Sequence, residues 1–117
     1  MPTPFTTLRA LAAQAAEGTS APSTVLSLAS AGPYVEVRIT GGSLAGSPTS
    51  VTFGVWRGVD GGIDKIGTFT VAAADIGGPL PPIFEFDAGS CWVRVESFAG
   101  GTGPTLTGTI QARPWFG

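Results

Sequence analysis

The sequence predicts an all-β protein: an antiparallel β-sandwich of about seven strands, preceded by an N-terminal arm or short helix. Two observations support this fold class. Short runs of alternating apolar and polar residues recur from residue 24 onward, and the 18 glycines and 10 prolines fall largely between those runs. The connections are also too short, and too rich in glycine and proline, for the crossover helices of a parallel sheet. Jelly-roll-like and immunoglobulin-like arrangements both fit, because the pattern does not reveal the strand order.

Residues 1–23 are predicted to form an arm, or a short helix followed by a linker, and residues 24–117 the sandwich body. Thr3 could cap a helix, Pro4 suits its first position and Gly18 suits its end. Helical spacing would place four apolar side chains on one face: Phe5, Leu8, Ala12 and Ala15. Because alanine buries little area, this stripe would hold a helix only weakly against the body.

The clearest strand is YVEVRIT, residues 34–40, where alternate residues fall on opposite faces. Valine and isoleucine occupy one face, and charged residues and threonine the other, as expected for a half-buried strand. Six further runs are predicted to be strands by the same reasoning: residues 25–28, 50–56, 66–73, 82–87, 90–98 and 105–113. The stretches GGSLAGSP and DIGGPLPP are predicted to be connections, because glycine and proline disfavour regular strands.

The stretch WRGVDGGIDKIGTF, residues 56–69, has two interpretations. Strand-like sequence on both sides and an Asp-Gly step predict a hairpin tip, which we favour. The alternative is a calcium loop with Asp60 and Asp64 as ligands, but calcium requires six to eight oxygens and no closing glutamate follows. Further carboxylates could complete the site only if folding gathers them at this loop: Asp75, Glu85 and Asp87.

The residue types needed for common catalytic sites are largely missing. Histidine is absent, which excludes Ser-His-Asp and Cys-His nucleophile systems. Cys91 is the only cysteine and is predicted to be a small buried apolar residue. Lys65, the only lysine, is predicted to be solvated beside the hairpin tip. Glu85 and Asp87 are predicted to lie on the solvated face of a strand. We therefore expect a protein that is not an enzyme and has no cofactor or metal.

The charge pattern also restricts the partners. The six basic residues are scattered singly and the net charge is −2, so the positive stripe of a nucleic-acid-binding protein is missing. No apolar run approaches the ~18 residues that span a membrane. The segment LRALAAQAA is too short and too polar for a convincing signal peptide. The expectation is a protein made and folded in a cytoplasm, with neither nucleic acid nor membrane as partner.

Aromatic and apolar residues outside the predicted core are candidate contacts for another protein. In the run SCWVRVESF, strict alternation would turn Trp92, Arg94, Glu96 and Phe98 outward, and Trp56 would lie near them if the two strands pair. The tail ARPWFG raises the same possibility of docking. The candidate contact residues are Phe5, Leu8, Trp56, Trp92, Phe98, Trp115 and Phe116.

In style, the chain resembles the small all-β decoration or cement proteins on the capsids of tailed bacteriophages. The features that carry this resemblance are the N-terminal segment of residues 1–23, YVEVRIT, the run VTFGVWRGVDGGIDKIGTFTV, and CWVRVES. The resemblance implies homo-oligomers, often trimers, clamped between major capsid subunits. It also implies location in a virion after synthesis in the host cytoplasm. Head–tail connection and tail-tip proteins are similar in the same way, and no family site residue carries over.

Two functions follow as expectations. The first is a structural virion protein, decoration or cement, that stabilises a phage head through protein–protein contacts. The second is a carbohydrate- or receptor-binding β-sandwich, because tryptophan rings such as those of Trp56 and Trp92 can stack on sugars. The exposure of these two tryptophans would separate the two functions.

Overall fold

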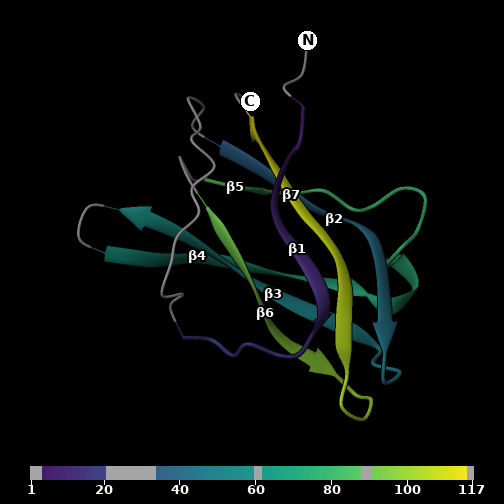
Figure 1. Ribbon diagram of the computed structural model, residues 1–117. Helices are drawn as coiled ribbons and strands as arrows, with labels where there is room; N and C mark the ends of the chain where they lie inside the picture. Colours follow the sequence, from purple (N-terminus) through teal and green to yellow (C-terminus); the bar gives the residue numbers. More distant parts are fainter. Residues whose placement is uncertain (1–3, 21–33, 60–61, 88–90, 116–117) are drawn as a thin grey trace.

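A computed structural model of the chain describes residues 4–20, 34–59, 62–87 and 91–115. The backbone forms strands almost throughout (Figure 1), which confirms the predicted all-β class. The only helical turn among these residues is a 3-10 turn at Ala73–Asp75. The seven strands are β1 (Thr6–Gln14), β2 (Tyr34–Ala45), β3 (Ser50–Val59), β4 (Gly62–Ala72), β5 (Phe84–Phe86), β6 (Trp92–Ala99) and β7 (Thr105–Trp115).

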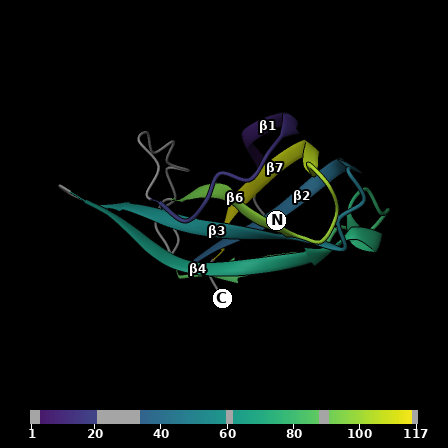
Figure 2. The same ribbon diagram turned by 90° about the horizontal axis from the view of Figure 1, so that it is seen from below.

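The strands form two antiparallel sheets that pack as a β-sandwich (Figure 2). One sheet has four strands in the order β1-β7-β2-β5, and the other has three in the order β4-β3-β6. The described molecule is flat, with principal extents of 40 × 34 × 19 Å. All six predicted runs that begin at residue 34 or later are strands. The run predicted at residues 25–28 lies outside the described residues.

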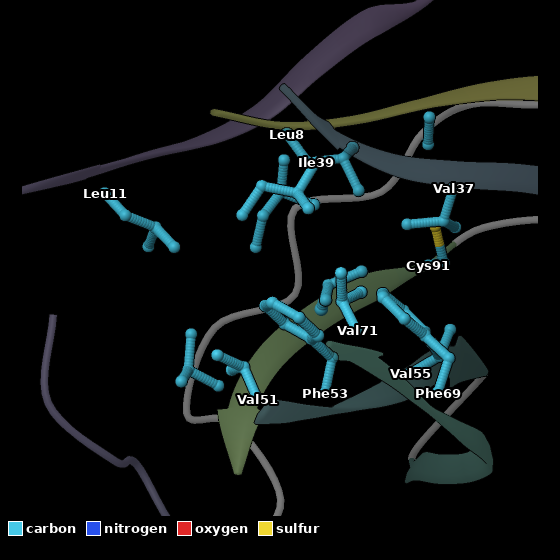
Figure 3. Close-up of a cluster of buried hydrophobic side chains, with 14 of the residues drawn as sticks. Leu8, Leu11, Val37, Ile39, Val51, Phe53, Val55, Phe69, Val71 and Cys91 are labelled. Atoms are coloured by element: carbon cyan, nitrogen blue, oxygen red, sulfur yellow. The ribbon is translucent and has the colours of Figure 1, made fainter. Parts of the chain in front are cut away.

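The core lies between the two sheets and is filled by the alternate residues that the sequence placed inward (Figure 3). Val35 and Val37 from β2 and Phe53 from β3 have no exposed surface. Burying a side chain of this size contributes about 1.5–3 kcal/mol, so the core as a whole is a main source of the stability of the sandwich. Cys91 is also fully buried, as predicted, and burial raises the pKa of its thiol to about 12.

Of the two alternatives for the N-terminal segment, the short helix is wrong, because residues 6–14 form strand β1, paired antiparallel with β7. Two register irregularities interrupt this pairing, one between Thr7 and Arg9 and the other between Leu11 and Gln14. A bulged strand breaks strict alternation, so both Leu8 and Leu11 are buried at a spacing of three that imitates a helix. Pairing with β7 overrides the helix propensity of the alanines.

A second irregularity reverses the predicted faces at the end of β6. Opposite the neighbouring residues Thr52 and Phe53 of β3 stand Ser97 and Val95, so Glu96 is an extra residue in β6. Beyond this bulge Phe98 pairs with Val51 and packs against the core. The expectation that Phe98 shares the outward face of Trp92 is therefore wrong. Glu96, which was expected to turn outward, has an exposure of only 6%.

The stretch GGSLAGSP is only partly a loop. Strand β2 continues to Ala45 through an irregularity at Gly41 and Gly42, where Gly41 has a φ of 61°. A positive φ is readily adopted by glycine, which explains how the strand continues past the break in pairing. The true turn begins at Gly46, whose carbonyl accepts a 2.9 Å hydrogen bond from Thr102 N. The two turns at this end of the sandwich are thereby joined.

Candidate interaction surface

The stretch 56–69 forms the predicted β-hairpin between β3 and β4, with Val59 paired to Gly62. Asp64 pairs with Arg57 across the two strands, and Asp60 lies outside the described residues. Within the described ranges, no group of three or more His, Cys, Asp or Glu residues is placed to hold a metal ion. The alternative of a cation at Asp60 and Asp64 stays untested.

The further carboxylates considered for that loop are distributed over other elements. Asp75 lies in the 3-10 turn, Glu85 lies on β5 opposite Glu36, and Asp87 follows β5. All three of these suggested carboxylates are exposed. The prediction that Glu85 and Asp87 are solvated is confirmed.

The phenylalanines of β3, β4 and β5 close one open side of the sandwich, and we call them the phenylalanine stack. Phe69 stacks on Phe53 with ring centroids 4.8 Å apart and on Phe84 at 4.4 Å, and Phe86 lies tilted at 5.9 Å. A Cβ atom on Gly67 would come within 3.0 Å of the Phe86 ring. The absent side chain at Gly67 therefore leaves room for Phe86 to join the stack across the two sheets.

The opposite open side, between β1 and β6, is closed by polar groups that we call the Glu17 clasp: Arg9, Glu17 and the β6 backbone. Arg9 Nη1 donates to Glu17 Oε1 at 2.6 Å and to the Val93 carbonyl at 3.0 Å, and Nη2 reaches Oε2 at 3.1 Å. Val95 N donates to Glu17 Oε1 at 2.9 Å, and Glu17 N donates to the Val95 carbonyl at 2.6 Å. Backbone groups of the edge strand β6 are thereby paired.

Burial alone would raise the pKa of Glu17. The hydrogen bonds from Arg9 and Val95 N, with the charges of Arg9 and Arg94, more than offset that effect. The pKa of Glu17 therefore lies below its ordinary value of 4.5, and the carboxylate form is the one that closes the clasp.

Four of the predicted contact residues have packing partners within the protein. Leu8 and Trp56 are buried, with exposures of 8% and 7%. The Arg9 guanidinium lies 4.8 Å from the Trp92 ring centroid. Phe5 lies under two guanidinium groups, at 3.8 Å from Arg38 and 4.3 Å from Arg113. Phe5, Trp92 and Phe98 are half-buried, and Phe98 packs against the core.

Of the two remaining predicted contacts, Trp115 ends β7, where its backbone pairs with Tyr34, and Phe116 lies outside the described residues. The role of the aromatic tail stays a prediction.

On the outer face of the three-stranded sheet, Lys65 is held by an ion pair to Glu96 and lies 5.8 Å from the Trp56 ring centroid. Lys65 is exposed, as predicted, and the ion pair to Glu96 is an additional contact that the sequence did not indicate. A side chain at Gly54 would overlap the Glu96 carboxylate, so this glycine creates the space for the buried acid. The pair neutralises both charges on this face.

The largest exposed apolar side chains among the described residues are not the predicted contact residues. Leu80 is 88% exposed and Ile83 46%, both in the segment 76–83 that we call the apolar loop, and Tyr34 is 36% exposed. Gly77 anchors the start of this loop with a φ of 76°, and a side chain there would overlap the Gly42 carbonyl. In Figure 1 the loop extends outward between the 3-10 turn and β5.

The stretch DIGGPLPP is predicted from the sequence only as a connection, and that prediction misses the exposed apolar surface of this loop. A signal was present: Pro79, Pro81 and Pro82 lack the N–H needed for strand pairing, and they flank Leu80. Apolar residues held between prolines cannot enter the interior of a central strand. Such residues are expected to remain at the surface.

Comparison with protein-family models, with curated proteins and with solved structures finds no match to this chain. Among the described residues, no helix has the length and apolar character needed to cross a membrane.

Proposed function

We propose that the protein is a non-enzymatic structural component of a virion, a decoration or cement protein that stabilises a phage head through protein–protein contacts. The partner is the major capsid protein or another virion protein. The resemblance of the sequence to such proteins supports a location in a virion. The apolar loop is the surface that we propose contacts the partner.

The observation that carries the proposal is the exposure of Leu80, 88%, on a loop anchored at both ends. The loop begins with Ile76, which packs against the core, and leads into β5, whose Phe84 pairs with Val37. Because both ends of the loop are held by the body, ordering its backbone on a partner costs less conformational entropy than ordering a free segment. Leucine and isoleucine placed this way suit a small apolar pocket of another protein.

The test has two parts. Mass spectrometry of particles purified from the source, scaled against the major coat protein, should show about one copy per coat subunit or a simple fraction of that number. A handful of copies would favour a tail or connector position, and absence from every particle would overturn the proposal.

The second part compares binding by two variants. The double variant Leu80→Ser/Ile83→Ser should keep the fold, because both side chains are exposed, and should bind stripped particles at least about tenfold more weakly, the equivalent of about 1.4 kcal/mol. The matched control Ala10→Ser/Ala12→Ser changes two exposed residues of β1. Normal binding by the loop variant would remove the loop from the contact.

Deleting residues 1–20 would not be an informative test of particle binding. The deletion removes β1 and both Arg9 and Glu17, so β7 would lose a paired strand and β6 would lose the clasp. A loss of binding would then report unfolding of the sandwich.

No observation favours the carbohydrate-binding alternative at the residues first suggested for it. Trp56 is 7% exposed and Trp92 lies under the Arg9 guanidinium, so these rings do not form an open platform for sugar stacking. A glycan panel on purified protein remains the direct check, with tryptophan fluorescence as the readout.

A further inference from the structure

The sandwich has four edge strands, and their protection against pairing with other chains differs. The four-stranded sheet ends in β1 and β5, and the three-stranded sheet ends in β4 and β6. An edge strand presents unpaired N–H and C=O groups, which soluble proteins commonly cover, shorten, bend or interrupt with proline.

Three of the four edges carry such a feature. Strand β6 is covered by Glu17, through the backbone hydrogen bond to Val95 and the side-chain contacts of the clasp. Strand β5 has only three residues and follows Pro81 and Pro82. Strand β1 is broken by two register irregularities, and Ala13 near its end has a φ of 48°. Each feature limits the length of backbone that another strand could join.

Among the described residues, strand β4 is neither short, nor covered by another segment, nor interrupted by proline. It spans 11 residues without proline, and its only charged residues are Asp64 and Lys65. Lys65 is already paired with Glu96. Its one irregularity lies at Ile66, between the pairs Val55–Gly67 and Trp56–Lys65, and from Gly67 to Ala72 the register with β3 is regular. Within the described part of the chain β4 pairs only with β3, and Figure 2 shows it along the border of its sheet.

We propose that two copies of the protein associate edge to edge through antiparallel pairing of their β4 strands. Three strands from each copy then form one sheet of six. We infer a second copy as the partner of this edge. A two-fold axis beside β4 places the same strand of the second copy antiparallel to it, so one set of residues has to be compatible with itself.

The charges of β4 are compatible with this pairing. With the two-fold axis at Thr68, Asp64 stands opposite Ala72 of the second copy and Lys65 stands opposite Val71. No like charges face each other, and the exposed residues Thr68 and Thr70 meet threonines and an apolar residue. Threonine is favourable in a strand and adds no charge repulsion.

This inference goes beyond the proposed function and does not depend on it. A β4 dimer could exist free in solution, whether or not the apolar loop binds a capsid. An extended segment of another protein could also add to the β4 edge, and the experiment separates that outcome from a dimer.

The experiment is sedimentation velocity of the full chain over a concentration series. The wild type should sediment as a dimer at the higher concentrations. Thr68→Lys/Thr70→Lys places like charges at the axis and should weaken the dimer by about tenfold or more. The control Thr6→Lys/Thr7→Lys adds the same charge to exposed residues of β1 and should match the wild type.

A cysteine variant locates the axis independently. Thr68→Cys should form a disulfide-linked dimer under mild oxidation, and Cys91 should not compete because it is fully buried. Thr6→Cys should stay monomeric on a denaturing gel.

Three results would overturn the inference: a wild type that is monomeric at every concentration, a dimer dispersed by the β1 lysines and not by the β4 lysines, or cross-linking at Thr6 only. A monomer that still binds particles would overturn the β4 dimer and leave the proposed function standing. A protein that forms the β4 dimer but is absent from all particles would overturn the proposed function and leave the β4 dimer standing.

Discussion

The two open sides of the sandwich are closed by opposite chemistry. The phenylalanine stack joins β4 to β5 through rings 4.4–5.9 Å apart, and the Glu17 clasp joins β1 to β6 through an ion pair and backbone hydrogen bonds. The apolar side excludes water, but no described segment pairs with the outer backbone edge of β4. The polar side covers the backbone of β6 but depends on a charged carboxylate. The chemistry that closes a side of the sandwich therefore determines two properties. It determines whether the backbone edge on that side can pair with another strand, and whether a change in pH can open that side.

Removing the central ring of the apolar side should have the largest effect. Phe69→Ala deletes a ring that contacts Phe53, Phe84 and Phe86, and should lower the free energy of unfolding by about 3–5 kcal/mol. Urea denaturation at pH 7 measures this loss, with the exposed Thr68→Ala on the same strand as control. A loss below about 1 kcal/mol would mean that the stack does not close this side.

Neutralising the clasp should have a smaller effect that depends on pH. Glu17→Gln should cost about 2 kcal/mol at pH 7, because Glu17 accepts charge-assisted hydrogen bonds from a partly buried Arg9. The pKa of Glu17 is lowered in the folded protein, so its contribution is complete above 4.5, its ordinary value, and is lost as pH falls through the folded value.

The difference in stability between wild type and Glu17→Gln should therefore shrink in acid, whereas the loss in Phe69→Ala should not follow this titration. Urea titrations from pH 7 down to pH 3 test the contrast. A difference for Glu17→Gln that stays constant over that range would show that its carboxylate does not carry the clasp.

Filling the space beside Phe86 should lower the free energy of unfolding by less than the loss of the clasp does. Gly67→Ala brings a Cβ atom to 3.0 Å from that ring, and the overpacking should cost about 1 kcal/mol or slightly more. Phe86→Leu removes the neighbouring ring, so the double variant should recover part of the loss. Additive effects in this double-mutant cycle would argue against the contact between Gly67 and Phe86.

The last prediction concerns the accessibility of Cys91, where the native protein itself should show almost no reaction. Its thiol is fully buried, and burial raises its pKa to about 12, so the native protein should react very slowly with thiol reagents at pH 8. Because Cys91 immediately precedes β6, Glu17→Gln should speed labelling by about tenfold per 1.4 kcal/mol of lost stability. Labelling that is equally slow in both proteins would mean that opening of the clasp does not expose this end of β6.

Much of the sandwich was predictable because its central strands alternate cleanly. Val35, Val37 and Ile39 were predicted to point inward, and all three are buried. The hairpin at residues 56–69 was predictable from its Asp-Gly step. Local patterning is sufficient where a strand has one wet and one dry face.

The errors arose where one extra residue shifts the pattern. The bulge at Glu96 reverses the faces of β6, and it depends on the opposite strand β3, which local sequence does not reveal. The irregularities in β1 produce a helix-like spacing at Leu8 and Leu11. The clasp joins Glu17 to Val95, residues 78 positions apart, so only the fold brings them together. Of the surface, the apolar loop alone could have been inferred, from its prolines.

The pairing of β1 with β7 has a consequence for how the chain acquires its structure. Thr6 pairs with Ala112, and β7 lies between β1 and β2. A ribosome releases β1 long before β7, so the first strand has no neighbour in its sheet until the seventh is made. Contacts that span nearly the whole chain slow folding. The described fold is therefore expected to form late and cooperatively. It becomes complete when β7 is synthesised and pairs with β1 on one side and β2 on the other.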